Sequence, residues 1–267
     1  MLTHPDHPGT LLFEVADLAA TEPHPAAAGA VDQLRAVVRW AREYLCRPHP
    51  ELGRRGPVCP YAQASLERGT FYLAVRRGRS IDAAALEHLL GDYRTWFRQL
   101  EPVTGSGAQF KTILLVFPDL PDAAAAVVDA IQERLKPQYV ADGLMIGEFH
   151  GGPPPKAGLW NADFRPLRSP LPLLAIRHMV VTDFPFLAGD RDLVAAYLRL
   201  FGQVLPAGLR RRVAAEAARW GLPEPGAAVA PVADPAVAAV AGIAGPTATV
   251  GPATDPGVVA APQPQGV

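Results

Sequence analysis

The chain has few cysteines and no surplus of positive charge. Its 267 residues include two cysteines, Cys46 and Cys59, and the formal net charge is −1. Two cysteines without a CxxC spacing exclude the disulfide framework of a small secreted domain and a zinc or thioredoxin-like motif, so two free thiols are expected. The balanced charge excludes the broad basic surface of a nucleic-acid-binding protein, and local arginine clusters need a local explanation.

Long apolar runs are also absent. No stretch approaches the roughly 18 to 20 residues that cross a bilayer, and the first residues, MLTHPDHPGTLLFEV, show neither a basic leader nor a sustained hydrophobic stretch. P-loop, nucleophile-elbow and HExxH motifs are missing as well. We therefore expect a cytoplasmic protein whose partner is a small molecule rather than nucleic acid or membrane; a homodimer is compatible with the sequence.

Hydrophobic periodicity predicts strands separated by helices, and this order favours an α+β (mixed α/β) fold with a small central sheet flanked by helices. We expect a single domain over residues 28–220, after a loosely ordered lead-in over 1–27. Residues 221–267 are rich in Pro, Ala and Gly with scarcely a charge, which predicts a disordered tail. The expected strands are 70–76, 111–117, 144–149 and 173–181, and the expected helices are 31–45, 60–69, 80–100 with Ser80 as N-cap, 123–135, 190–205 and 209–220.

His150 is the first candidate for chemistry. It follows an apolar strand and precedes Gly151-Gly152 and three prolines, so its imidazole would lie at a strand end with room around it. This position suits a metal or haem ligand or a general base. The alternative is a loop histidine that is hydrogen-bonded to Glu148 or to the backbone.

Cys59 is the second candidate, because it immediately precedes the helix expected from Pro60. The helix dipole, together with Arg54 and Arg55, would favour its thiolate for nucleophilic catalysis or ligation. The alternative is a small buried thiol beneath a proline turn. Cys46, at the end of a helix, is expected to pack.

A cationic set completes the candidates: Arg165, Arg168, Arg177 and Lys111. The run FRPLRSP presents two arginines on a backbone that prolines restrict, which suits a carboxylate or phosphate. The alternative is pairing with Glu148, Asp163 or Asp183. His178 falls within a strand, where a satisfied core histidine and a ligand are both open.

Four segments carry a resemblance: GPVCPYAQASLERG, KTILLVFPDL, IQERLKPQYVADGLMIGEFH and NADFRPLRSPLPLLAIRHMV. In this order they resemble a family of bacterial proteins known only as a domain of unknown function, over roughly residues 30 to 190. The resemblance names a family without naming a reaction.

A looser likeness is to the YqcI/YcgG-type haem proteins, some of which oxygenate guanidino or amino nitrogen in specialised metabolism. The likeness matches His150 to the histidine after a strand and Cys59 to the cysteine of a Phe-Pro-Cys element, although Val58 precedes the cysteine here. Arg168-Ser169 matches that family's Ser-Arg element in reversed order. The likeness implies a haem cofactor and a monooxygenase activity.

Three functions are therefore expected. The first is a haem-dependent oxidative enzyme with His150 as iron ligand and the cationic set on the propionates or on a carboxylate or amino-acid-like substrate. Apolar side chains would line its pocket: Met145, Phe149 and Met179. The second is thiol chemistry without a metal, with Cys59 as nucleophile and His150 or His178 as base. The third is a non-catalytic module that binds a small molecule or a partner.

Overall fold

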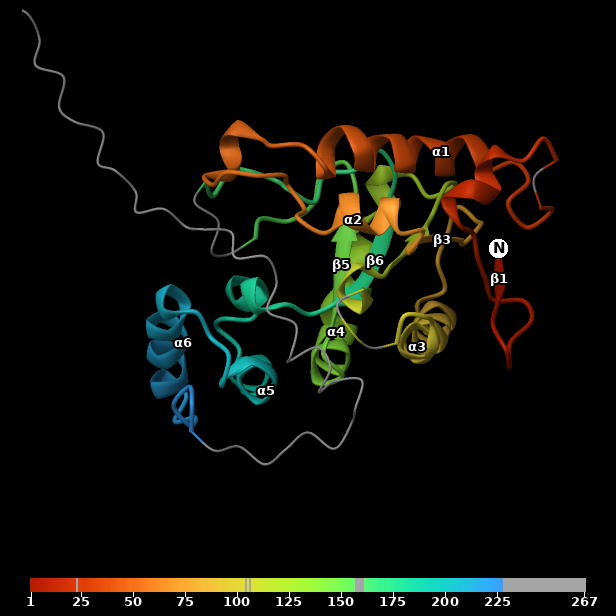
Figure 1. Cartoon of the computed structure of the whole chain (residues 1–267). Coiled ribbons are helices and arrows are strands. Elements are labelled where there is room, and N and C mark those ends of the chain that lie inside the picture. Colours follow the sequence, from red (N-terminus) through yellow and green to blue (C-terminus); the bar gives the residue numbers. More distant parts are fainter. Residues whose placement is uncertain (23, 104, 106, 157–160, 228–267) are drawn as a thin grey trace, which may run out of the picture.

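A small four-stranded sheet with helices on both faces forms the centre of the protein, as Figure 1 shows for the computed structural model. The structure describes residues 1–22, 24–103, 105, 107–156 and 161–227. The α+β fold that the sequence predicts is confirmed. The expected tail lies outside the described residues from position 228 onwards. Among the described residues, no helix has the length and apolar character needed to cross a membrane.

The four expected strands all form, and their order is β3-β4-β6-β5. The β3 and β4 strands are parallel, whereas β6 is antiparallel to both of its neighbours, β4 and β5. The bounds are β3 (Phe71–Val75), β4 (Thr112–Val116), β5 (Leu144–Phe149) and β6 (Leu173–His178). The last strand in the sequence therefore lies inside the sheet, and β5 lies at its edge.

Alternate side chains of the strands enter two different cores. On one face, Tyr72, Ile113 and Ile176 pack against α3 and α4. On the other face, Phe71 and Leu114 pack against α1 and α2. Helices α5 and α6 form a third apolar cluster with the 3₁₀ turn η6 (Val181–Phe186). The helix bounds are α1 (Val31–Trp40), α2 (Ala62–Glu67), α3 (Ala83–Gln99), α4 (Ala126–Ala141), α5 (Arg191–Phe201) and α6 (Ala207–Arg219).

Several helix boundaries differ from the sequence prediction by a few residues; α5, for example, ends at Phe201 rather than at residue 205. Two of the differences involve a capping residue and a proline. The N-cap of α3 is Asp82 rather than Ser80, because the Asp82 carboxylate accepts the N–H groups of Ala84 at 2.9 Å and Ala85 at 3.1 Å. Helix α4 does not end at residue 135 but continues through Pro137. Pro137 is exposed, so water can reach the carbonyl that loses its helical partner.

The helix expected over residues 31–45 ends in a wider turn. After α1, residues Ala41–Leu45 form the π-helical turn η2. The N–H of Cys46 donates to the carbonyl of Ala41, five residues earlier, at 2.9 Å. The chain then leaves α1 beside the segment that carries Cys59.

The N-terminal segment is held more firmly than the sequence predicts. Strands β1 (Leu2–Thr3) and β2 (Leu11–Leu12) form a small antiparallel pair. Phe13 then exchanges two backbone hydrogen bonds with Leu73 of β3, at 2.7 and 2.8 Å. Both Leu12 and Phe13 are buried, so these residues contribute to the core.

Candidate functional site

Strands β5 and β6 are incompletely covered on the side that faces α1. Four of their residues there are half-buried: Gly147, Phe149, Ala175 and Arg177. We call this side of the two strands the open face. Gly147 lies directly opposite Ala175 in the antiparallel register, so the middle of the open face carries the two smallest side chains.

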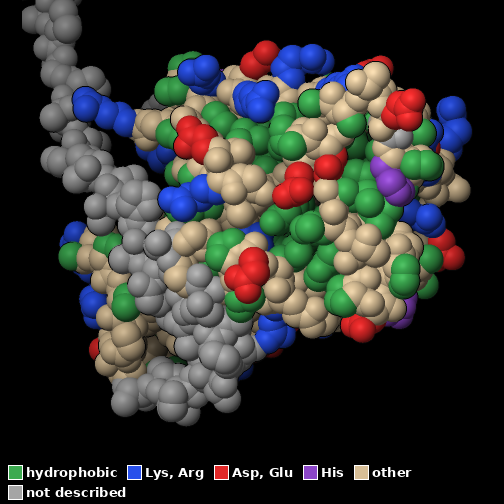
Figure 2. Space-filling model, turned by 45° about the vertical axis from the view of Figure 1, so that its right-hand side comes forward, with side chains coloured by type: hydrophobic (Ala, Val, Ile, Leu, Met, Phe, Trp, Pro, Cys, Tyr) green, Lys and Arg blue, Asp and Glu red, His purple; other side chains and the backbone are tan. Residues whose placement is uncertain are grey.

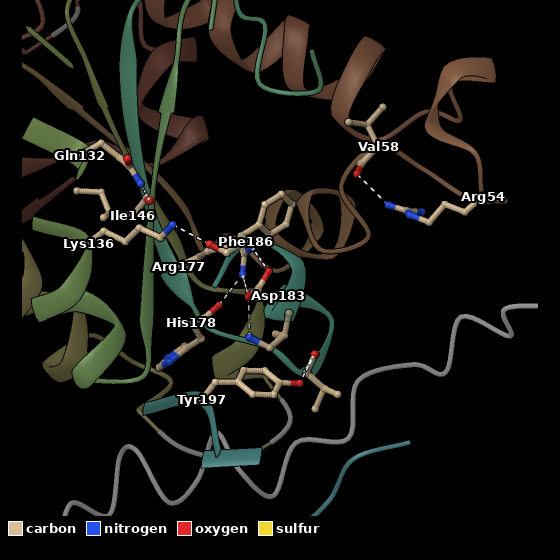
Figure 3. Close-up of polar contacts among 12 residues, drawn as sticks. Arg54, Val58, Gln132, Lys136, Ile146, Arg177, His178, Asp183, Phe186 and Tyr197 are labelled. Atoms are coloured by element: carbon tan, nitrogen blue, oxygen red, sulfur yellow. Dashed lines mark hydrogen bonds and ion pairs between the residues drawn. The ribbon is translucent and has the colours of Figure 1, made fainter. Parts of the chain in front are cut away.

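Arg177 lies at one end of the open face and is held by Asp183 of η6. Its two terminal nitrogens donate to the two carboxylate oxygens of Asp183, at 2.7 and 2.6 Å, as Figure 3 shows. Asp183 is 2% exposed and also accepts the N–H of Val180 at 2.8 Å. Burial alone would lower the pKa of Arg177, but Asp183 outweighs it and the pKa is raised. Arg177 is thus a fixed cation.

Cys59 lies within electrostatic range of this pair. Its backbone N–H donates to the carbonyl of Leu45 at 2.8 Å, and its side chain is half-buried. Its sulfur is close enough to interact electrostatically with Arg177 and with Arg54. Arg54 is an exposed side chain that donates to the carbonyl of Val58 at 3.1 Å, and Figure 3 shows it across from Arg177. Cys59 is therefore a partly exposed thiol with two nearby cations.

Tyr61 adds a hydrogen-bond donor to the same place. Its hydroxyl interacts with Asp183, Arg177 and the side chain of Thr182. Burial raises the pKa of Tyr61, and the negative charge of Asp183 raises it further. The phenol therefore stays protonated at neutral pH and can donate to a negatively charged ligand.

Aromatic side chains close the opposite end of the open face. Trp40 makes an edge-to-face contact with Phe149, with ring centroids 5.7 Å apart. The Trp40 ring nitrogen donates to the carbonyl of Arg168 at 3.1 Å, and Tyr44 donates to that of Arg165 at 3.4 Å. These bonds hold the arginine-rich segment against the end of α1.

The arginine-rich segment uses its side chains on its own loop. Arg168 donates through Nε to the carbonyl of Gly151 at 3.0 Å, and Arg165 donates to that of Ala162 at 2.7 Å. Of the carboxylate pairings weighed from the sequence for the three arginines, the one between Arg177 and Asp183 forms in the described part of the chain. Arg165 and Arg168 therefore shape the loop beside the open face.

His150 lies on the other side of the sheet, facing α4. Its Nδ1 accepts the N–H of Gly152 at 3.2 Å, so Nε2 carries the ring proton and lies 3.0 Å from Asp129 Oδ1. Both ring nitrogens are engaged, and the side chain is 7% exposed. The hydrogen-bonded alternative fits this geometry, with Asp129 as the partner. The structure does not bring His150 together with Cys59.

Glu148 lies on the same side as His150 and is almost fully buried. One of its carboxylate oxygens contacts Lys156, and the other has no hydrogen-bond partner among the described residues. Lys136 of α4 is close enough to Glu148 to interact electrostatically, and it donates to the carbonyl of Phe186 at 2.7 Å. Burial lowers the pKa of Lys136, with Lys156 adding to the effect.

Lys111 and His178 are core residues. The Lys111 ammonium donates to the carbonyl of Leu100 at 2.6 Å, at the end of α3, and lies 4.7 Å from the centre of the Phe97 ring. Burial lowers the pKa of Lys111 to about 8. His178 also contacts Phe97, and burial lowers its pKa to about 3, with Lys111 and Arg177 adding to the effect. Neither side chain reaches the open face.

The residues expected to bind haem do not form a common pocket. Both nitrogens of His150 are occupied, Phe149 points to the opposite face of the sheet, and Met179 is fully buried among the α5 and α6 contacts. No group of three or more His, Cys, Asp or Glu side chains suited to a metal ion occurs among the described residues. This arrangement does not fit haem at His150, and the cofactor stays a prediction.

Two depressions in the surface along α1 are lined by other residues than those of the open face. One, of about 520 Å³, is lined by residues of α1 and by Pro170 and Leu171. The other, of about 880 Å³, runs between η1 (Val15–Ala19), α1 and α2. In Figure 2, apolar side chains gather in the middle of one face, with Lys and Arg along its upper edge. Neither depression contains a cysteine or histidine, so the open face is the better candidate site.

Sequence reasoning named Arg54 near Cys59 but missed three other features of the site: Tyr61, the Gly147–Ala175 floor and the position of Cys46. One sequence signal for Cys46 was present. Pro48 and Pro57 flank a glycine-containing connection, which is a signal for a hairpin that would bring the two cysteines near one another. The alternation of side chains along a strand shows which residues share a face of the sheet, but not which face the helices cover. It could therefore not identify the open face.

The fold and site define a small α+β domain with a thiol and fixed cations on a partly open sheet. The chain belongs to the family described as "Domain of unknown function (DUF6875)", whose model matches residues 34–212. This match confirms the membership in a domain-of-unknown-function family that the sequence motifs suggested. No curated protein and no solved structure matches the chain.

Proposed function

We propose that the protein is a thiol-dependent enzyme that acts on a small carboxylate-bearing molecule, with Cys59 as nucleophile. The observation that carries the proposal is the half-buried Cys59 thiol, which packs against the same core as Phe149 and Ala175 of the open face and lies within electrostatic range of Arg54 and Arg177. A carboxylate of the substrate would bind near these cations. Cys59 would attack an electrophilic carbon of the substrate and form a covalent bond to it as the leaving group departs.

Tyr61 is the proposed donor to the negative charge that develops on the substrate or on the leaving group. Its raised pKa keeps the proton on the phenol at neutral pH. The apolar floor and the aromatic end of the open face would contact the remainder of the substrate. No histidine is assigned as base, because both strand histidines, His150 and His178, face away from Cys59.

The test compares two alkylating reagents of similar size, the anion iodoacetate and the neutral iodoacetamide. On the full reduced chain, we expect Cys59 to prefer iodoacetate, relative to a free cysteine peptide, by about fivefold, since one nearby charge contributes about 1 kcal/mol in water. Arg54→Ala should lower this preference. The matched control is Arg191→Ala, which removes an exposed arginine that pairs with its neighbour Asp192.

Dicarboxylates should also protect Cys59 from iodoacetamide in a saturable way. Equal rates for the two reagents, together with no protection, would refute the anion site. If protection saturates but no carboxylate-bearing ester, halide or epoxide is turned over in a Cys59-dependent manner, the protein is a binding module instead of an enzyme.

A further inference from the structure

The two cysteines of the sequence flank a short antiparallel pairing that brings them near each other. Val58 N–H donates to the carbonyl of Arg47 at 2.8 Å, and Pro48 and Pro57 form an isolated antiparallel bridge. Beyond this bridge the Cys59 N–H donates to the carbonyl of Leu45, the residue before Cys46, at 2.8 Å, so the two cysteines lie close to one another.

The pairing is supported at both of its ends. On one side, the π-helical turn η2 ends at Cys46, whose N–H donates to Ala41. On the other side, Cys59 N–H donates to the carbonyl of Leu45 at 2.8 Å. The connection between the arms uses Gly53 and Gly56, both with positive φ, 68° and 92°. The backbone therefore fixes the two cysteines next to one another.

The separation of the two backbones suits a disulfide. The Cys59 N–H bonds the peptide carbonyl that joins Leu45 to Cys46, at 2.8 Å, which holds the two Cα atoms within about 7 Å of one another, and disulfides span about 4.4 to 6.8 Å. Both thiols are half-buried, and both pack at the edge of the core beneath α1. Burial raises the pKa of Cys46, and the nearby Cys59 raises it further.

We propose that Cys46 and Cys59 form a reversible disulfide that removes the nucleophile from the open face. The bond needs only the two thiols, whereas its effect on reactivity rests on the proposed function. The oxidant is a low-molecular-weight disulfide. Cys59 attacks it and releases one thiol, and Cys46 then attacks the Cys59 sulfur and releases the second. In total, the protein loses two hydrogen atoms and the oxidant becomes two thiols.

The order of the two steps follows from the surroundings of each sulfur. Cys59 lies within electrostatic range of Arg54 and Arg177, which attract an anionic disulfide such as oxidised glutathione. Cys46 has a raised pKa and is mostly a thiol at neutral pH, so it attacks second. The second step should therefore become faster as the pH rises.

The experiment treats the full reduced chain with oxidised glutathione and follows it by intact mass and by thiol titration in denaturant. The wild type should lose both titratable thiols and two hydrogen atoms, and it should retain no glutathione. Cys46→Ser should retain one glutathione on Cys59. Cys59→Ser should react at least several-fold more slowly. Dithiothreitol should restore both thiols of the wild type.

The proposal is overturned if the wild type accumulates glutathione on either cysteine, forms a disulfide between two chains, or keeps both thiols under conditions that modify Cys46→Ser. Its failure can be told apart from failure of the proposed function. If the disulfide forms but Cys59 shows no preference for iodoacetate, the proposed function is refuted and the disulfide stands. If Cys59 prefers iodoacetate but no disulfide forms, the disulfide is refuted and the anion-binding thiol stands.

Discussion

The two sides of strands β5 and β6 use polar residues in different ways. On the α4 side, His150 is almost fully buried and both of its ring nitrogens have partners. At the open face, Cys59 and Tyr61 are half-buried and lie within electrostatic range of the fixed cation Arg177. On the closed side the histidine is fully engaged, although one oxygen of Glu148 has no partner among the described residues, whereas the open face leaves reactive groups within reach of solvent.

This difference changes which of the sequence candidates is best placed for chemistry. A buried polar group with all its hydrogen bonds made contributes to stability, and it cannot bind a ligand without breaking those bonds. His150 belongs to this class. Cys59 does not, because its side chain is partly exposed and no disulfide restrains it. The predictions below separate stability on the closed side from reactivity on the open face.

The largest effect is expected at Asp183. Asp183→Ala would leave Arg177 without its carboxylate partner and Val180 N–H without an acceptor. Breaking a buried pair in this way should lower the free energy of unfolding by about 3 kcal/mol, measured by urea denaturation. Asp163→Ala, which removes an exposed carboxylate, is the control and should change it by less than about 0.5 kcal/mol. A similar loss of unfolding free energy in both variants would contradict the expected contribution of the Asp183–Arg177 pair.

The second effect on stability is expected at His150. His150→Ala removes the contact with Asp129 and the acceptor of Gly152 N–H, and should lower the free energy of unfolding by about 2 kcal/mol. The rate of Cys59 alkylation should stay within about twofold of the wild type, which corresponds to about 0.4 kcal/mol, because His150 lies on the side of the sheet away from Cys59. The control is His88→Ala on the exposed side of α3. A large fall in alkylation rate would contradict the separation of the faces.

A pH effect is expected from His178. Its pKa is about 3 in the folded chain and about 6.5 when unfolded, so only the unfolded chain binds this proton between these values. The contribution is fully present above pH 6.5 and is lost as the pH falls, by about 1.4 kcal/mol per pH unit. Urea denaturation at several pH values should show a smaller slope for His178→Leu than for the wild type. Parallel slopes would show that His178 is not buried as a neutral ring.

The smallest effect on stability is expected at Gly147. An added methyl group would meet only the ring of Phe149, at 3.4 Å, and Gly147 does not have a positive φ. Gly147→Ala should therefore change the free energy of unfolding by less than about 0.5 kcal/mol, again by urea denaturation. The same variant should weaken protection of Cys59 by dicarboxylates if these bind over the Gly147–Ala175 floor. Unchanged protection would place the ligand elsewhere on the open face.

Local patterns predicted the elements well. Apolar runs identified all four strands of the central sheet, but not the short β1 and β2, because a buried strand needs continuous or alternating apolar residues whatever its neighbours. Ends that depend on one side chain were less certain, as Asp82 and Pro137 show. The strand order could not be predicted, since it depends on contacts between residues far apart in the sequence, such as Thr112 and Arg177.

The candidate site was predicted only in part. Cys59 and Arg177 were identified, and the structure brings them together. His150 was placed correctly at a strand end, but its partner Asp129 lies 21 residues earlier, on a helix whose packing the sequence does not specify. Cys46 was expected only to pack, because its position close to Cys59 depends on the π-helical turn and the register of two loop segments.

The strand order also affects how the chain can fold during synthesis. Strand β6 is made last and lies between β4 and β5. A growing chain that ends before residue 173 therefore has no partner for β5 within the sheet. Contacts between such distant segments form slowly, because a long loop must close before they do. We expect the open face to be assembled in one late step, after residue 178 becomes available for pairing.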